Sequence, residues 1–535
     1  MKLERLHEYT LTTAVIGIGM GLALAAGQAT GTGRMKSVGI IIAGICVLGV
    51  CLACRTSIWL IIPLCWQLTG GVPISKLPFS VRDGAVLLTF GSFLIFYALK
   101  QLRYKPRFEL LDALIIANLL YLVTVYLRNP VGANWLGSQL VGGKPYFDIF
   151  IAFLAYAIIV RAPIDLKILR RLPIVLLFGY AMVSLGSLAV TIRPSLGDRL
   201  GKLYSAFAPP DPSSVGVVDE DMIGRKPLLS GFGEAGLRLF ASYFNPITFL
   251  SPLHPLRFLA AAIFMVAILL SGFRSALFGV FIYIGMSCYF RKRLREVAVF
   301  GLLGAVLLTM LALGNNRIFH LPLAAQRALS FLPGEWDYVA TSDAQASSEW
   351  RKQIWRMVLT EDQWIRNKWL GDGFGFTSYQ LSIMTSRQGY IGGAGSQEAF
   401  LVAGNYHSGP LSTIRYAGVA GLALFLPFMV LVSIRGFQLI KKSVGTSFFP
   451  VALFVGMPII YFPIPFIFVA GGYDSGLTEL LFSAGLIRLI ERAMLTESQQ
   501  KETAAGLPAG LTSVIPIHRG ATRAQRPYAP SLPKT

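Results

Sequence analysis

The sequence predicts an all-α polytopic integral membrane protein with about 12–14 transmembrane helices and one large outer loop that contains short helices. Two observations support this prediction. The 535 residues are 54% hydrophobic and only 14% charged, and a soluble domain of this length cannot bury so much apolar surface. The apolar residues also fall in runs of about 20 residues, the length that crosses the hydrocarbon core. Short basic clusters separate these runs.

The apolar runs begin near the N-terminus and leave one long polar gap, 315–410, late in the chain. A weaker run at 231–251 contains Glu234, Arg238 and Pro246. The strong candidate spans are 11–30, 38–54, 56–70, 84–100, 109–127, 147–161, 172–192, 256–272, 275–290, 296–314, 411–433, 447–470 and 475–491.

The basic clusters set the orientation, because Lys and Arg gather on the cytoplasmic side of a membrane. The clusters at 161–171 and 291–295 both lie inside only if the chain crosses once more between them, which favours 231–251 as a span. Both termini then lie inside, and the 315–410 loop lies outside. Glu234 and Arg238 would face the bundle interior or water, because ionisable side chains are costly in lipid.

We divide the chain into a transmembrane domain, 1–495, and a basic cytoplasmic tail, 496–535, which lacks apolar periodicity and is expected to be disordered. The net charge of +21 comes from clusters between spans, so we expect the lipid bilayer and not nucleic acid as a partner. The five cysteines lie in apolar runs, where packing is their expected role. The first run indicates an anchor and not a cleavable signal. No zinc or nucleotide motif is present, and we expect no metal and no cofactor.

Arg274 lies between two apolar runs, in the sequence LLSGFRSALFGVF. An isolated arginine at such a junction often extends its charge to the membrane surface. The functional interpretation is an anion-binding group, because guanidinium holds phosphate through two parallel hydrogen bonds and keeps its charge.

The outer loop supplies further cations. Residues 348–364 predict an amphipathic helix that carries Arg351 and Arg356, with its tryptophans at the membrane surface. For either arginine alone, a solvated helix face is the simpler explanation. The glycine cluster 371–375 follows this helix and is explained by a tight turn, because it does not match a nucleotide-binding loop.

His407 is the strongest candidate base. Ser408 or Gly409 can cap the apolar helix that follows, and Pro410 suits a first helical position. The positive end of the helix dipole favours neutral imidazole, the form that accepts a proton from a hydroxyl. A loop histidine alone is more often structural than catalytic, and His320 in the same loop is the alternative base.

Four local patterns follow one another along the chain: LSGFRSAL at 270–277, EWRKQIW at 349–355, LGDGFG at 370–375, and YHSGPL at 406–411 with GVAGL at 418–422. Together they resemble the O-antigen ligase and polymerase superfamily of bacterial membrane glycosyltransferases. The first is similar to that family's T-G-S-R-S-A-L-L signature, the third to L-G-x-G-x-G, and the last to H-N-x-x-L…G-x-x-G-L. Phe273 replaces the usual small polar residue and Ser408 the common asparagine, which affects the pyrophosphate pocket and the orientation of the acceptor.

The resemblance implies metal-independent glycosyl transfer on the periplasmic face of the bacterial inner membrane, in the synthesis of cell-envelope polysaccharide. The donor would be a glycan on undecaprenyl pyrophosphate, and the acceptor a hydroxyl of a glycan or of lipid A–core. His407 would accept the proton, and Arg274 and Arg351 would stabilise the leaving pyrophosphate. Possible additional contributors are His320, Arg238, Arg317, Arg327 and Arg356.

Two questions stay open at this stage. Ligase, polymerase and protein-glycosylating variants use the same base and leaving group, so the sequence does not separate them. A transporter or flippase for a charged lipid-linked glycan is the alternative from another class, and the proline-interrupted run GMPIIYFPIPF at 456–466 favours it.

Overall fold

The computed structural model describes residues 56–71, 79–98, 100, 106–132, 140–193, 195–202, 204–207, 224–249, 251–387 and 394–505. The predicted spans 11–30 and 38–54 and the end of the predicted tail lie outside these residues. Within the described ranges the protein is helical, and the β-type pairings are isolated bridges only. The all-α class is therefore confirmed.

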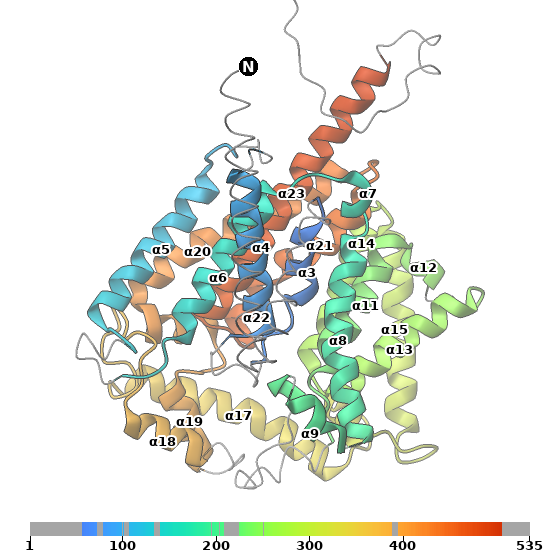
Figure 1. Ribbon diagram of the computed structural model, residues 1–535. Coiled ribbons are helices and arrows are strands. Elements are labelled where there is room, and N and C mark those ends of the chain that lie inside the picture. Colours follow the sequence, from blue (N-terminus) through green and yellow to red (C-terminus); the bar gives the residue numbers. More distant parts are fainter. Residues whose placement is uncertain are drawn as a thin grey trace, which may run out of the picture.

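Figure 1 shows a bundle of steep helices with a layer of further helices across one end. The first half of the bundle contains η1 (Ile58–Leu60), α3 (Ile61–Cys65), α4 (Val81–Ala98), α5 (Leu110–Arg128), α6 (Lys144–Arg161), α7 (Leu166–Leu169), α8 (Leu172–Ile192), α9 (Ser195–Gly201) and η3 (Ser205–Phe207). The next helices are α11 (Leu229–Tyr243), α12 (Pro246–Phe249), α13 (Pro255–Ser271), α14 (Arg274–Phe290) and α15 (Leu294–Gly314). The last are α20 (Gly409–Ser443), α21 (Phe449–Tyr461), α22 (Pro463–Phe468) and α23 (Tyr473–Ala505).

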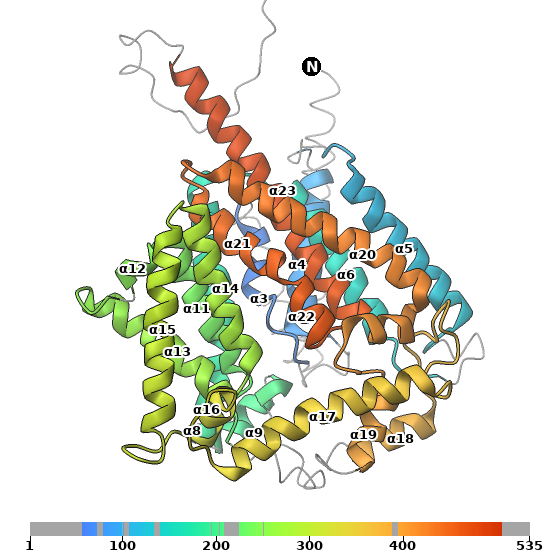
Figure 2. The same ribbon diagram turned by 180° about the vertical axis from the view of Figure 1, so that it is seen from behind.

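The polar segment between α15 and α20 folds into α16 (Leu323–Leu329), α17 (Tyr338–Thr360), α18 (Ser378–Arg387) and α19 (Ala394–Ala403). Figure 2 shows α17 running across the end of the bundle, with α18 and α19 beside one of its ends. The short helices expected in this loop are therefore present.

Five described helical segments are long and apolar enough to cross a membrane: α5, α8, α15, α20 and the combined α21–α22. Helices α13 and α14 are apolar but shorter. The protein is thus a membrane protein by helix length and composition, while the total of about 12–14 crossings stays a prediction.

Two of the predicted spans take a different form. In the 56–70 run the helix ends at Cys65, and Trp66 stacks on Phe482 of α23 at 4.0 Å between ring centroids, so these apolar side chains are covered by protein. The weak run at 231–251 forms two helices, α11 and α12, because Pro246 restricts the residue before it to non-helical backbone. Helix α11 packs against α13, α8 and α14, and Arg238 is buried within the bundle.

Several helices also run further than their apolar cores. Helix α20 was expected to end near 433 but continues through Arg435 and Lys441 to Ser443, and α23 reaches Ala505, beyond the expected start of the tail. A helix does not need to stop where the apolar residues stop, because its hydrogen bonds are internal.

The helices of the first and last thirds are joined inside the bundle. The Arg488 guanidinium of α23 donates to the Asp112 carboxylate of α5 at 2.7 Å, and the Tyr156 hydroxyl of α6 donates to the same carboxylate at 2.6 Å. Apolar side chains of α6, α20, α21 and α23 form the largest core around this ion pair. This core holds α20 in place, and the candidate site lies at the first residue of that helix.

Candidate functional site

The turn between α13 and α14 presents Arg274 at the end of the bundle that faces the polar segment. Ser271 ends α13, Gly272 adopts a left-handed backbone at φ 70°, and Arg274 is the first residue of α14. Glycine suits this position because it has no Cβ to clash in the left-handed region. Arg274 is half-buried and forms no ion pair with any described residue.

Arg327 of α16 fixes this turn from the polar segment. Its guanidinium donates to the Gly272 carbonyl at 2.7 Å and pairs with the Asp343 carboxylate of α17. Arg327 is only 7% exposed, so its charge is balanced by a carboxylate in a shielded place. It therefore acts as a structural link between the turn, α16 and α17.

Arg351 lies two turns further along α17 and has no such partner. Its side chain is half-buried, and its Nε atom is buried without a hydrogen-bond partner among the described residues. Burial lowers the pKa of Arg351, and the nearby charges of Arg327 and Arg274 lower it further. The three guanidinium groups are thus close enough to repel one another, with Asp343 as the carboxylate among them. We call Arg274, Arg327 and Arg351 the arginine cluster.

Arg225 adds a fourth cation that sequence reasoning missed. A Cβ built on Gly272 would lie 3.0 Å from Cγ and 3.1 Å from Cδ of Arg225, so this side chain lies against the turn. The backbone N–H of Lys226 donates to the Leu270 carbonyl at 3.0 Å, which fixes the segment there. The only available signal was its position just before α11, at the end of a loop that the sequence places outside.

His407 lies beside the arginine cluster, immediately before α20. Ser408 is the N-cap, one of the two positions that the sequence allowed, although its side chain makes no capping hydrogen bond, and the helix begins at Gly409, one residue before the expected Pro410. The imidazole contacts the Trp350 ring at 5.0 Å and the Phe400 ring at 5.7 Å between centroids.

Burial and, to a smaller extent, the Arg351 charge together lower the pKa of His407 to about 4, against the opposing effect of a hydrogen bond to the Val469 backbone. The ring is therefore neutral at pH 7. The expected neutral imidazole has its main cause in this burial, and the helix dipole is an additional contribution. A neutral imidazole that donates through one ring nitrogen to the main chain at Val469 carries a lone pair on the other, which can accept a proton.

The backbone of the His407 loop is held from two sides. The Trp355 indole donates to the Tyr406 carbonyl at 2.8 Å, and the Tyr406 N–H donates to the Ser412 hydroxyl at 3.2 Å. His407 itself has a φ of 49°, an uncommon value for a non-glycine residue. Strain of this kind persists only where surrounding contacts impose it, and it is frequent at functional sites. These same contacts place Trp350, Trp355 and Trp364 against protein, whereas the sequence favoured a position at the membrane surface.

The glycine cluster at 371–375 has a structural role. Helix α20 is broken at Gly418, where φ is 72° and ψ is 178°. Across this break, the N–H of Val419 donates to the Lys368 carbonyl at 2.8 Å and that of Asp372 to the Arg415 carbonyl at 2.9 Å. A Cβ on Gly418 would lie 2.2 Å from the Trp369 carbonyl oxygen. Two of the four recognised patterns therefore meet in space because glycine permits close approach of two backbones.

The other candidates lie apart from His407 and the arginine cluster. Arg238 lies inside the bundle, over the rings of Phe454 at 4.4 Å and Tyr283 at 5.7 Å. Arg356 is exposed on the far side of α17, and His320 is exposed, with its Nδ1 2.8 Å from the Asn316 side-chain oxygen. In the described ranges, no group of three or more His, Cys, Asp or Glu residues is placed to hold a metal ion. The roles assigned to all these residues stay predictions.

The chain was also compared with known proteins. No family model matches it, and no curated protein matches it.

Proposed function

We propose that the protein is a membrane glycosyltransferase of the O-antigen ligase and polymerase type. One observation carries this proposal: a neutral, half-buried histidine lies near the half-buried Arg351, which in turn lies near the half-buried Arg274, and neither arginine has an ion pair with a described residue. Unbalanced buried charge is costly, so such a place favours an anionic ligand. A pyrophosphate carries several negative charges, and guanidinium groups bind its oxygens well.

The proposed reaction is the transfer of a glycan from a lipid pyrophosphate to a hydroxyl. The acceptor oxygen attacks the anomeric carbon, and the bond between that carbon and the pyrophosphate oxygen breaks. His407 accepts the hydroxyl proton, and the electron pair of the broken bond stays on the pyrophosphate. Arg274 and Arg351 stabilise this added charge, a contribution that is large wherever water is excluded.

The low pKa of free His407 is compatible with this role. Arg351 contributes to lowering it, and a pyrophosphate bound to the same guanidinium reverses that field. The donor thus offsets the part of the shift in the His407 pKa that Arg351 causes, while the larger part, which burial causes, remains. The base gains strength when its substrate is present.

The proposed setting is the bacterial inner membrane, with the site on the periplasmic face and a glycan or lipid A–core as acceptor. The arginine cluster and the basic turn at 291–295 lie at opposite ends of α14, which supports this orientation, because basic turns favour the cytoplasmic side. The apolar helices beside the arginine cluster would contact the polyprenyl tail.

The test is complementation of a deletion strain with His407→Ala and, in parallel, His320→Ala, at matched expression. Loss of surface glycan with the first variant alone supports the proposed base, and normal glycan with His407→Ala would overturn it. Lipid-linked glycans in the deletion strain then separate the variants of the reaction: long chains indicate a ligase, and single repeat units a polymerase.

A transporter for a charged lipid-linked glycan is the second candidate. The observation that favours it is the set of prolines in α21 and α22, Pro458, Pro463 and Pro465, which remove backbone N–H donors from an apolar segment whose backbone stays helical at Phe462. A reporter-fusion topology map separates the two proposals. If residues 315–408 lie in the cytoplasm, glycosyl transfer on the periplasmic face is excluded.

A further inference from the structure

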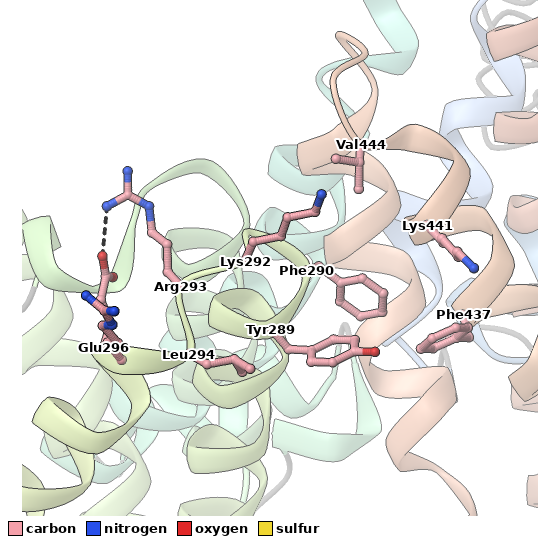
Figure 3. A pocket seen from close by; sticks show the side chains of 10 residues that line it. Tyr289, Phe290, Lys292, Arg293, Leu294, Glu296, Phe437, Lys441 and Val444 are labelled. Carbon is pink, nitrogen blue, oxygen red and sulfur yellow. Dashed lines mark hydrogen bonds and ion pairs between the residues drawn. The ribbon is translucent and has the colours of Figure 1, made fainter.

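A second basic site lies at the other end of α14 and α20. Figure 3 shows a pocket between the α14–α15 turn and the last turns of α20. Its volume is about 1030 Å³. The sequence identified the same turn only as a marker of orientation, because the approach of α20 to it depends on tertiary packing.

The walls of this pocket carry more positive than negative charge. Its cations are Lys292, Arg293, Arg295 and Lys441, and its carboxylate is Glu296. Arg293 donates to the Glu296 carboxylate at 2.8 Å, so this negative charge is already compensated. No ion pair with a described residue involves the remaining three cations. They come from the α14–α15 turn, from α15 and from the end of α20, and so the pocket that they share is a property of the fold.

The floor of the pocket is apolar and aromatic. The Phe290 ring lies 5.2 Å from Tyr289 and 5.3 Å from Phe437 between centroids, and Figure 3 shows the three rings beside Lys292 and Lys441. Leu294 and Val444 complete it. Tyr289 is 52% exposed, so this apolar surface is open to a ligand. Cations above an open apolar floor fit a molecule with an anionic head and hydrocarbon chains.

Lys292 also has an unusual backbone. It follows α14 with a φ of 58°, in the left-handed region where glycine is normally found. The N–H of Arg293 donates to the Cys288 carbonyl at 2.8 Å, which closes the helix end as in a glycine-ended helix. A lysine at this place costs roughly 1 kcal/mol of backbone strain relative to glycine. The requirements of the turn therefore do not explain why a lysine occupies this position.

We propose that this pocket binds the headgroup of an anionic phospholipid. The headgroup lies in the pocket that Lys292, Arg295 and Lys441 line, and the glycerol and first acyl carbons lie on the apolar floor. The helices that frame the pocket are apolar, and α15 and α20 are long enough to cross a membrane. Lipid molecules of the bilayer are therefore next to the pocket. A soluble anion has no hydrocarbon that could pack on the open apolar floor. The lipid would fix the position of α20 relative to α14 and α15.

The experiment uses the full chain, purified in detergent and stripped of lipid, with thermal unfolding as the readout. Phosphatidylglycerol is titrated against wild type, against Lys292→Gly/Lys441→Gln and against Lys442→Gln. Lys442 is the matched control, because it is the exposed neighbour of Lys441 on the same helix but does not line the pocket. Lys292→Gly preserves the turn, since glycine is the natural residue at this backbone position. Phosphatidylcholine and inorganic phosphate are added in separate series.

We expect phosphatidylglycerol to raise the unfolding temperature of wild type and of Lys442→Gln, with phosphatidylcholine and phosphate far less effective. The double variant should need roughly tenfold or more lipid for the same shift, because two cations near the headgroup are lost. An equal shift with phosphatidylcholine would overturn the proposal, and so would an equal loss in Lys442→Gln. An equal shift with inorganic phosphate would replace the lipid by a soluble anion. The readout is binding, so the outcome is independent of the proposed glycosyl transfer.

Discussion

Two basic sites lie at opposite ends of the same two helices. At one end Arg274 begins α14 and His407 precedes α20, while at the other Lys292 follows α14 and Lys441 lies near the end of α20. Both ends contain a non-glycine residue with a left-handed backbone, His407 at φ 49° and Lys292 at φ 58°. They differ in burial: the first is shielded by Trp350, Phe400 and the polar segment, and the second is open.

This difference shows that burial, and not the amount of positive charge, separates the two sites. Burial of the His407 ring is the main cause of its lowered pKa, and the shielded charge of Arg351 adds to it. An exposed cation is screened by water and salt, and attracts a charged headgroup without changing the chemistry around it. The predictions below change one end at a time.

The largest effect is expected from His407→Asn. Asparagine accepts a left-handed backbone but cannot act as a general base, so glycan transfer should fall by about 10²–10⁴-fold while the protein still folds. The measurement is transfer by purified protein, with thermal unfolding as the check on folding. His320→Asn is the control and should keep normal transfer. A transfer rate close to wild type in His407→Asn would remove the difference between the two ends.

The second effect is on stability as a function of pH. The pKa of His407 is about 4 in the folded protein and ~6.5 in the unfolded chain, so the unfolded chain binds the proton first as pH falls. This histidine has no effect above ~6.5, and it destabilises the fold progressively from there down to pH 4, by at most roughly 3 kcal/mol. Thermal unfolding of wild type and His407→Asn across this range measures it. The two curves should separate between these pH values, and parallel curves would mean that the histidine is not shielded.

The third effect concerns the geometry of the arginine cluster. Arg351→Lys keeps the charge but loses the paired hydrogen bonds to phosphate oxygens, so transfer should fall roughly 10–100-fold. Arg356→Lys is the matched control on the same helix, because Arg356 is exposed, and it should change transfer less than about twofold. Equal losses in both variants would indicate a general effect on α17 and not a buried anion site.

The smallest effect is expected at the open end. Lys292→Gly relieves the backbone at φ 58° and should raise stability in lipid-free detergent by up to about 1 kcal/mol. Transfer should not change, because this end of α14 is remote from the arginine cluster. Chemical or thermal unfolding measures the first expectation. A clear loss of stability without lipid would show that Lys292 has a structural contact and would weaken the contrast between the ends.

The sequence was sufficient for features that depend on local patterns. The apolar run 172–192 coincides with α8, and Ser408 occupies the N-cap of α20, one of the two cap positions that the sequence allowed. The predicted span 56–70 differs from the structure because a tertiary contact determines its form. Trp66 stacks on a ring from α23, more than 400 residues away, and the helix does not extend over the whole run.

The candidate site was predictable only in part. The sequence identified Arg274, Arg351 and His407 one by one, and the structure places Arg351 near each of the other two. The sequence offers no reason to prefer Arg327 to Arg356. Arg327 differs from Arg356 in its ion pair with Asp343, and only the folded segment brings these two side chains together. Arg225 was missed because its contact with Gly272 joins two loops.

The break in α20 at Gly418 bears on how the chain is made. A break leaves backbone N–H and C=O groups without helical partners, and each such group costs several kcal/mol in hydrocarbon. Here the carbonyls of Lys368 and Trp369 accept from the N–H groups of Val419 and Ala420. Residues 368–373 leave the ribosome before α20 does, so the partners of the break exist before the helix that needs them. Deleting this short segment should therefore impair membrane insertion of α20 during synthesis. This effect does not depend on whether the protein is catalytically active.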